Sequence, residues 1–134
     1  MKQYLLDTSA LLTLRDDEPG AEEVAKILVQ AEQDKVKVFG CFMTLMEVFY
    51  RVWKDEDETA GRLAYAQCKS LPIVWVHENV EMLEQAAELK ATFRVSLADA
   101  WIAACAIIHD ATLIHKDPEF NALKSIRQTA LPYK

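Results

Sequence analysis

Residues 96–117 read SLADAWIAACAIIHDATLIHKD, and this stretch decides the fold class. Its centre, Ala100 to Ile108, is apolar at every position, so a helix over residues 97–109 has no polar face. A helix of this kind belongs in the interior of a protein, covered on all sides. Thr112-Leu113-Ile114 then predicts a buried strand, and an acid, Asp117, follows it. A buried helix that leads into a buried strand is typical of proteins in which helices cover a parallel sheet.

The rest of the chain alternates strands with helices in the same way. Short apolar or alternating runs predict the strands, and apolar residues at intervals of three and four predict the helices. Strands are expected at residues 3–6, 36–40, 73–76, 112–114 and, at an edge, 129–131, and helices at residues 9–15, 21–33, 44–54, 60–69, 79–91, 97–109 and 120–126. This order predicts a three-layer α/β/α fold, with a mostly parallel sheet of four or five strands and helices on both faces. The chain, residues 1–134, is expected to be a single domain.

The composition is that of a packed soluble protein, with 51% hydrophobic and 27% charged residues. No apolar run approaches the roughly 20 residues that span a bilayer. Asp7 also interrupts the first apolar run too early for a signal peptide. We therefore expect a cytoplasmic protein with no membrane contact. The three cysteines are widely spaced without a Cys-x-x-Cys pair, so buried reduced thiols are expected rather than a zinc ribbon or a redox pair.

The net charge is −6 and the pI is about 5.0. This balance argues against broad electrostatic binding of nucleic acid, which requires an excess of Lys and Arg. It remains compatible with a local basic rim around an acidic pocket, and also with a basic protein partner.

Four carboxylates lie where predicted strands end or predicted helices begin. Asp7 follows the first strand, Asp117 follows the fourth, and Glu47 and Asp99 lie in the first turns of apolar helices. Open α/β sheets gather ligands at the carboxyl ends of their strands. If the first and fourth strands are neighbours, Asp7 and Asp117 meet where the strand order reverses. Four acids gathered there would repel one another unless a divalent cation lay between them, so the pattern predicts a hard-metal site.

Each acid also has an ordinary interpretation as a helix cap. Thr44-x-x-Glu47 and Ser96-x-x-Asp99 match a capping box, Asp7 precedes a helix, and Asp117-Pro118 is typical of an N-cap followed by proline. Capping needs only a small polar side chain, and Ser or Asn would serve equally. Because all four residues are anionic, a metal site is favoured over capping alone, and the two roles are compatible.

Four short motifs carry a resemblance to a known family. They are Asp7-Thr8-Ser9, Thr44-x-x-Glu47, Ser96-Leu97-Ala98-Asp99 and Lys116-Asp117-Pro118-Glu119-Phe120. In this order and spacing they resemble the PIN domain, and most closely the VapC-type toxins of toxin–antitoxin pairs, over nearly the whole chain. The resemblance implies a PIN-like fold and a metal-dependent endoribonuclease that uses Mg²⁺ or Mn²⁺. It further implies the toxin of a type II pair, with a cognate antitoxin as partner and a homodimer as the assembly.

The resemblance also implies which residues form the site. Asp7, Glu47, Asp99 and Asp117 would be catalytic, and the metal would be held by Asp7, Asp99 and Asp117. We expect Asp7 and Asp99 to be direct ligands, while Asp117 and Glu47 orient waters or hold a second ion. A divalent ion would supply the chemistry of phosphodiester hydrolysis by lowering the pKa of water and polarising the phosphate.

Three further side chains are expected to contact the substrate: Ser9, His115 and Lys116. The family often has a hydroxyl two residues after its first Asp, which is the position of Ser9. It commonly has Thr two residues before its last Asp, where this chain has His115. This histidine is therefore either a structural residue or a hydrogen-bond partner of a phosphate or carboxylate.

The substrate must approach the acids past their negative charge. A basic rim is expected from Arg15, Arg51, Lys54, Lys90, Arg94 and Lys116. Tyr50 and Trp53 either stack bases or, as such residues do more often, join Phe49 in a core or dimer contact. Single-stranded RNA or an exposed loop is the expected substrate because its bases can be splayed out.

Other functions are open from the sequence. The main alternative is a non-catalytic interaction module whose acidic pocket binds a basic partner peptide. A haloacid-dehalogenase-type phosphatase requires a second acid at the position of Ser9, and a receiver module requires an acidic neighbour beside Asp7. A zincin requires histidine at the position of Glu81, three residues after Glu78. RNA cleavage by the purified chain, with and without EDTA, separates an enzyme from an interaction module.

Overall fold

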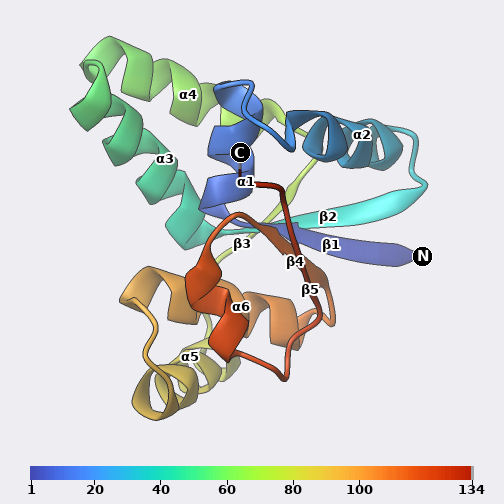
Figure 1. Cartoon of the computed structure of the whole chain (residues 1–134), viewed down its shortest axis with the longest axis vertical. Coiled ribbons are helices and arrows are strands. Elements are labelled where there is room, and N and C mark those ends of the chain that lie inside the picture. The colour runs from blue at the N-terminus through green and yellow to red at the C-terminus, as the bar shows by residue number, and fades with distance from the viewer. Residues whose placement is uncertain (134) are drawn as a thin grey trace.

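A five-stranded parallel sheet forms the centre of the computed structural model, which describes residues 1–133 (Figure 1). The strands are β1 (Lys2–Leu6), β2 (Val36–Cys41), β3 (Val74–Val76), β4 (Thr112–His115) and β5 (Gln128–Ala130). Their order across the sheet is β3-β2-β1-β4-β5, and each neighbouring pair is parallel. The predicted parallel sheet is therefore confirmed, with five strands.

Helices cover both faces of this sheet. Those in the described chain are α1 (Thr8–Arg15), α2 (Ala21–Glu32), α3 (Phe42–Asp55), α4 (Glu58–Ser70), α5 (Val80–Thr92), α6 (Leu97–Ile108) and the 3-10 helix η1 (Pro118–Ala122). Figure 1 shows α1 to α4 on one side of the sheet and α5, α6 and η1 on the other. Alternate strand residues serve the two sides: Leu6 packs in the cluster under α1 to α4, and Leu5 in the cluster under α5 and α6. The three-layer α/β/α prediction is confirmed.

Helix α6 lies at the centre of one of these layers. Ile102, Ala103, Ala104 and Cys105 have no exposed area. The sheet lies on one side of the helix and α5 and η1 on the other, so the middle of α6 is surrounded by protein, whereas Leu97 at its start is exposed. This explains why the run from Ala100 to Ile108 lacks a polar face.

Strands β1 and β4 are direct neighbours, as the metal-site prediction required. Leu6 aligns with Ile114, and the Asp7 N–H donates to the Ile114 carbonyl over 3.2 Å. On one side of this pair the sheet continues to β2 and β3, and on the other to β5. The strand order therefore reverses between β1 and β4, and Asp7 lies at the opening this creates.

Most predicted boundaries agree with the structure within two residues, and two differences affect the site. Helix α3 begins at Phe42 rather than residue 44, because Phe42 and Met43 pack against the buried cluster around α6 and extend the helix backward. Residues 120–126 do not form a helix. Instead, the 3-10 helix η1 begins at Pro118 directly after its N-cap, Asp117, and ends at Ala122.

The three cysteines are buried and unpaired, as predicted. Within residues 1–133, no helix combines the length and the apolar character needed to cross a bilayer.

Candidate metal centre

Asp7 lies in the turn between β1 and α1, and its side chain is almost fully buried. Its Oδ1 atom accepts the Ala10 N–H over 3.0 Å, which caps α1, and the Ser9 hydroxyl over 2.6 Å. Burial raises the pKa of Asp7 to about 7, the two hydrogen bonds oppose this, and the charges of Asp117 and Glu47 add to it. Asp7 thus combines the capping role with a place in the acid cluster.

Ser9 connects the ends of the two central strands. Its hydroxyl donates to Asp7 and accepts the Lys116 backbone N–H over 2.8 Å. The segment after β1 and the segment after β4 are therefore held at one fixed spacing. In this structure Ser9 positions Asp7.

Asp99 is held in a different way. Ser96 is the N-cap of α6, and its hydroxyl accepts the Asp99 N–H over 3.1 Å. The reciprocal capping-box bond from Asp99 is absent, because the Ser96 N–H donates to the Glu119 carboxylate instead. The Asp99 carboxyl group is 6% exposed and turns toward the other acids.

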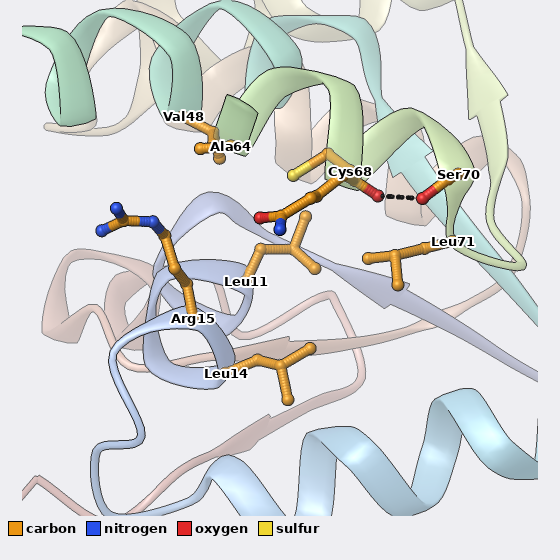
Figure 2. A pocket seen from close by; sticks show the side chains of 9 residues that line it. Leu11, Leu14, Arg15, Val48, Ala64, Cys68, Ser70 and Leu71 are labelled. Carbon is orange, nitrogen blue, oxygen red and sulfur yellow. Dashed lines mark hydrogen bonds between the residues drawn. The ribbon is translucent and has the colours of Figure 1, made fainter. Parts of the chain in front are cut away.

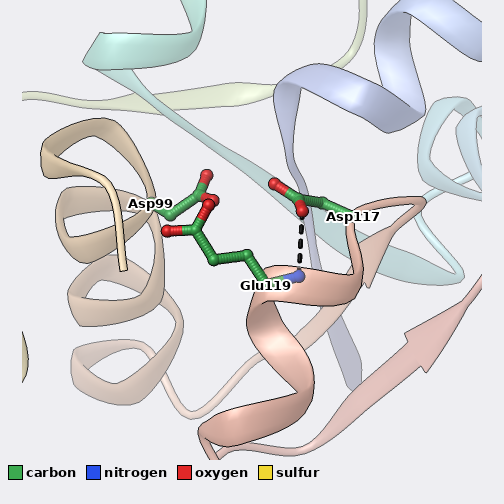
Figure 3. A group of neighbouring side chains, drawn as sticks. All are labelled: Asp99, Asp117 and Glu119. Atoms are coloured by element: carbon green, nitrogen blue, oxygen red, sulfur yellow. Dashed lines mark hydrogen bonds between the residues drawn. The ribbon is translucent and has the colours of Figure 1, made fainter. Parts of the chain in front are cut away.

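Figure 3 shows Asp99 converging with Asp117 and Glu119, which come from the start of η1. These three residues offer carboxylate oxygens that lie within 4.8 Å of one another. The pKa of Asp99 is raised to about 9. Burial is the largest cause, and a hydrogen bond to Asp117 and the charges of Asp117, Glu119 and Asp7 add to it. Without a cation, Asp99 therefore keeps its proton at neutral pH and shares it with Asp117.

His115 orients the segment that carries Asp117. Its Nδ1 atom accepts the Asp117 N–H over 3.1 Å, and its Nε2 atom lies 2.8 Å from Gln128 Oε1. The Gln128 amide nitrogen donates to two carbonyls, of Phe120 and Leu123, so its oxygen is the acceptor and the His115 proton is on Nε2. Burial lowers the pKa of His115, which favours this neutral ring.

The geometry favours the structural role for His115, and its contact with substrate stays a prediction. The residue has no exposed area, and both ring nitrogens already have protein partners. Its place is behind Asp117, where it fixes the backbone from which that carboxylate projects.

Glu47 approaches the cluster from α3. Because α3 begins at Phe42, Glu47 lies in the second turn, and the predicted capping box with Thr44 does not form. The N-cap is Cys41, which makes no side-chain bond. The Thr8 hydroxyl instead lies 2.7 Å from Glu47 Oε1 and 3.1 Å from Thr44 Oγ1. A carboxylate only accepts, so Thr8 donates to Glu47, and Thr8 is a positioning residue that the sequence reasoning missed.

Lys116 points away from the acids. Its ammonium group donates to the Pro19 carbonyl over 2.6 Å and lies 4.0 Å from Glu18. With 12% of its side chain exposed, it fastens the loop after α1. Its backbone, through the bond to Ser9, is the part of Lys116 nearest the site.

The acid cluster fits a hard divalent cation. Ligand oxygens around Mg²⁺ at about 2.1 Å lie about 3.0 to 4.2 Å apart in an octahedron, slightly closer than the 4.8 Å span of Asp99, Asp117 and Glu119. All the side-chain donors are carboxylate oxygens, which Mg²⁺ and Mn²⁺ favour. Burial is the main cause of the raised pKa values of Asp7 and Asp99, and repulsion from the neighbouring acids adds to it; a cation would oppose both. Glu119 is a candidate ligand that the sequence analysis did not name, although it lies two residues after Asp117.

The chain was compared with models of protein families. The PIN domain model matches residues 4–125 of the chain. The chain belongs to the PIN domain family.

Solved structures of similar fold are PIN toxins of toxin–antitoxin systems. VapBC2 from Rickettsia felis, bound to a promoter DNA fragment, matches with a TM-score of 0.77 and 16% identity over 97% of this chain and 99% of that one. VapBC from Salmonella typhimurium, also bound to DNA, matches with a TM-score of 0.77 and 17% identity over 97% and 98%. VapC20 from Mycobacterium tuberculosis, a toxin that cleaves the sarcin-ricin loop, matches with a TM-score of 0.71 and 21% identity. The match covers 90% of this chain and 95% of that one. No curated protein matches the chain.

Half of the six basic side chains expected to form a rim around the site of this PIN domain are engaged by other groups of the protein. Arg15 pairs with Glu56 over 2.8 Å, Lys90 donates to the Val95 carbonyl over 2.8 Å, and Lys116 is engaged as described. Within residues 1–133, the side chains of the other three make no ion pair or hydrogen bond; these are Arg51, Lys54 and Arg94.

Two neighbouring cavities lie beside α1, and none of the acids of the cluster lines either of them. A polar cavity of about 240 Å³ is lined by Ser9, Thr13, Arg15 and Arg51 and also by four acids, Asp16, Glu18, Asp55 and Glu56. Beyond it lies an apolar cavity of about 370 Å³ between α1, α3 and α4, with Arg15 at its edge (Figure 2). Its apolar lining comes from Leu11, Leu14, Val48, Ala64 and Leu71. Arg15 lines both cavities, which therefore adjoin.

Proposed function

We propose that this PIN domain is a metal-dependent endoribonuclease that hydrolyses RNA phosphodiester bonds, and that it is the toxin of a type II toxin–antitoxin pair. The observation that carries the proposal is the convergence of Asp99, Asp117 and Glu119, with oxygens within 4.8 Å, beside buried Asp7. Family membership supports it, because the acids occupy the order and spacing of the motifs that resemble VapC-type toxins.

In this proposal each acid has a separate task. Asp99 and Asp117 bind a Mg²⁺ or Mn²⁺ ion, and Glu119 adds a third oxygen. Asp7 faces the same site with its second oxygen, Oδ2, since Oδ1 is occupied by Ser9 and Ala10. Glu47, held by Thr8, orients water on the α3 side. When bound, the ion would supply a more acidic water and a polarised phosphate.

The RNA substrate is proposed to be single-stranded or a loop. Unpaired bases can be splayed away from the scissile phosphate, which lets a phosphate reach acids that are 2% and 6% exposed, Asp7 and Asp99. The similar VapC20 toxin, which cleaves the sarcin-ricin loop, supports a loop substrate.

An antitoxin partner is supported by the VapBC complexes among the similar structures. The two adjoining cavities fit a partner segment with an apolar side chain over Leu11 and Leu14 and a basic side chain directed at the carboxylates that line the polar cavity. A basic arm of this kind would also serve the alternative function, a non-catalytic module with an acidic socket.

The homodimer and the cytoplasmic location stay as proposals. Of the predicted dimer residues, Phe49 is half-buried, stacked against Trp53 and Tyr65, whereas Tyr50 and Trp53 are 46% and 44% exposed. The exposed face of α5 and α6 is more apolar, and Leu83 and Leu97 project from it with 48% and 63% exposed. Sedimentation of the parent and of L83E/L97E over micromolar concentrations tests whether this face dimerises.

RNA cleavage by the purified chain tests the enzyme. We expect cleavage of RNA in Mg²⁺ or Mn²⁺, its loss in EDTA, and its loss in Asp99→Asn. Asp110→Asn is the matched control, because Asp110 is exposed and its φ of 50° is a conformation that Asn also tolerates. Equal cleavage by Asp99→Asn and the parent, or no cleavage by the parent with either metal, would overturn the proposal in favour of the interaction module.

A further inference from the structure

Helix α3 carries two of the three residues of the expected basic rim whose side chains make no ion pair or hydrogen bond within residues 1–133. Arg51 and Lys54 are exposed, and both follow Glu47 on the same helix. At about 100° per residue, Arg51 lies about 40° to one side of Glu47 and Lys54 about 20° to the other. The two cations therefore continue the face of α3 that Glu47 presents to the acid cluster.

Tyr50 belongs to the same exposed side. It lies about 60° from Glu47 around the helix axis, and it is 46% exposed. The neighbouring aromatic residues stack on one another, with ring centroids 5.8 Å apart for Phe49 and Trp53 and 4.9 Å apart for Phe49 and Tyr65. Tyr50 takes part in no aromatic pair within the described chain, so its ring is available to a ligand.

This side of α3 is linked to the acid cluster through Ser9. Arg51 and Ser9 line the same polar cavity, and Ser9 is hydrogen-bonded to Asp7 over 2.6 Å. The hydroxyl of Thr13, a residue with no exposed area, belongs to this cavity and has no hydrogen-bond partner among residues 1–133. The cavity thus offers an unused polar group, although four acids also line it: Asp16, Glu18, Asp55 and Glu56.

We propose that Tyr50, Arg51 and Lys54, the α3 strip, bind the single-stranded RNA next to the scissile phosphate. Arg51 and Lys54 contact two phosphates and Tyr50 stacks on a base, which is the combination that holds single strands without sequence readout. From Glu47 to Lys54 the helix rises about 10 Å, enough for about three stacked nucleotides. This inference rests on the proposed nuclease function and adds where its substrate lies.

The charges favour RNA over a second copy of this chain as the occupant. Arg51 and Lys54 place two positive charges on one exposed side of α3, and neither makes an ion pair or a hydrogen bond within residues 1–133. RNA presents a regular row of phosphates, and each of them offers one negative charge to Arg51 or Lys54. A second copy of this chain has a net negative charge but no such regular row.

Fluorescence anisotropy with a labelled pool of mixed-sequence 12-nucleotide RNA tests the α3 strip. The Asp99→Asn background prevents cleavage during the measurement. We expect R51A/K54A to bind at least tenfold more weakly and to lower the slope of log affinity against log salt by about 1.4, which is two single-strand phosphate contacts. We expect Tyr50→Ala to bind about 5- to 100-fold more weakly, and Tyr50→Trp to retain binding.

The matched control is K26A/K35A, which removes two exposed lysines from α2 and the turn after it. Both double variants make the net charge more negative by the same amount, since each removes two positive charges. Equal affinity and equal salt slope in R51A/K54A and K26A/K35A would overturn the inference. Unchanged RNA affinity together with a loss of dimer in R51A/K54A would overturn it in favour of a second copy.

The failure of this inference can be told apart from the failure of the nuclease proposal. If the parent cleaves RNA and R51A/K54A binds like the control, only the α3 strip is refuted. If the parent does not cleave RNA but R51A/K54A loses affinity, the α3 strip is supported as an RNA site and the nuclease proposal fails.

Discussion

The first turns of α1 and α6 each hold a buried aspartate, but they hold it differently. Asp7 caps its own helix, and two donors to Oδ1 keep its pKa near 7. In α6 a separate residue, Ser96, provides the cap, and the Asp99 carboxyl group receives no such donors. Burial, the hydrogen bond to Asp117 and the neighbouring charges therefore raise its pKa to about 9 without opposition. The comparison shows that when a serine caps the helix, the acid in the first turn is not needed as the cap and can bind a ligand. Asp99 is therefore the acid that depends most on a cation.

The largest expected effect comes from removing the charge of Asp99. We expect Asp99→Asn to weaken Mn²⁺ binding by more than about 100-fold, because even indirect partners of a ligand contribute 10- to 100-fold. Asp7→Asn should weaken it less, since Asn still caps α1. Calorimetric titration with Mn²⁺ measures both. A larger loss in Asp7→Asn than in Asp99→Asn would reverse the comparison.

The second effect is a strong pH dependence of metal affinity. Because the pKa of Asp99 is raised to about 9, a cation must displace its proton at neutral pH. We expect the Mn²⁺ affinity to rise by about tenfold per pH unit up to about pH 9, with about one proton released per ion. Titration in two buffers of different ionisation enthalpy counts the protons. No release at pH 7 would mean that Asp99 is already ionised without metal.

Stability in EDTA should also depend on pH. The folded-state pKa values of Asp7 and Asp99 lie above the ordinary value of 3.8, so the folded chain binds more protons than the unfolded chain between about pH 4 and pH 9. Stability is therefore complete at the acid end and falls as pH rises through this window. Urea unfolding at about pH 5 and pH 8.5 should show this fall, and Asp99→Asn should reduce it by at least about 1 kcal/mol.

An equal fall in Asp99→Asn and in the parent would show that Asp99 is not the group that titrates. Asp110→Asn provides the control for this measurement, since the Asp110 side chain is 85% exposed and pairs only with Arg127 in the described chain.

The smallest effect tests the cap itself. Ser96→Ala removes the acceptor for the Asp99 N–H and should destabilise the fold by about 1 kcal/mol. Ser125→Ala should have almost no effect, because Ser125 is exposed and its side chain makes no hydrogen bond within residues 1–133. A matched pair of urea transitions measures the difference. Equal midpoints would mean that Ser96 does not cap α6 in solution.

The spacing of apolar residues, together with the residues that end helices and strands, predicts most of the fold. The apolar run of α6 and the alternation of strands and helices indicate a covered parallel sheet, because burial on all faces requires apolar residues on all faces. The pairing of β1 with β4 is not contained in any local pattern, and it decides that Asp7 and Asp117 meet.

Side-chain direction explains where the site prediction was incomplete. Glu119 joins the cluster because Asp117 starts a tight 3-10 turn that brings the two carboxylates to one side, and a sequence predicts no such turn geometry. His115 and Lys116 directly precede Asp117 in the chain, yet Lys116 donates to the Pro19 carbonyl and His115 is hydrogen-bonded to Gln128. These partners are distant in sequence, so residue type alone indicated substrate contacts.

The most direct test of the central account is anomalous diffraction from a crystal soaked in Mn²⁺. We predict a peak bonded to oxygens of Asp99 and Asp117, with Glu119 beside it and Asp7 facing it. Asp99→Asn crystals soaked in the same way should lack the peak. A parent crystal with no peak among these acids, or with its Mn²⁺ elsewhere in the molecule, would contradict the account.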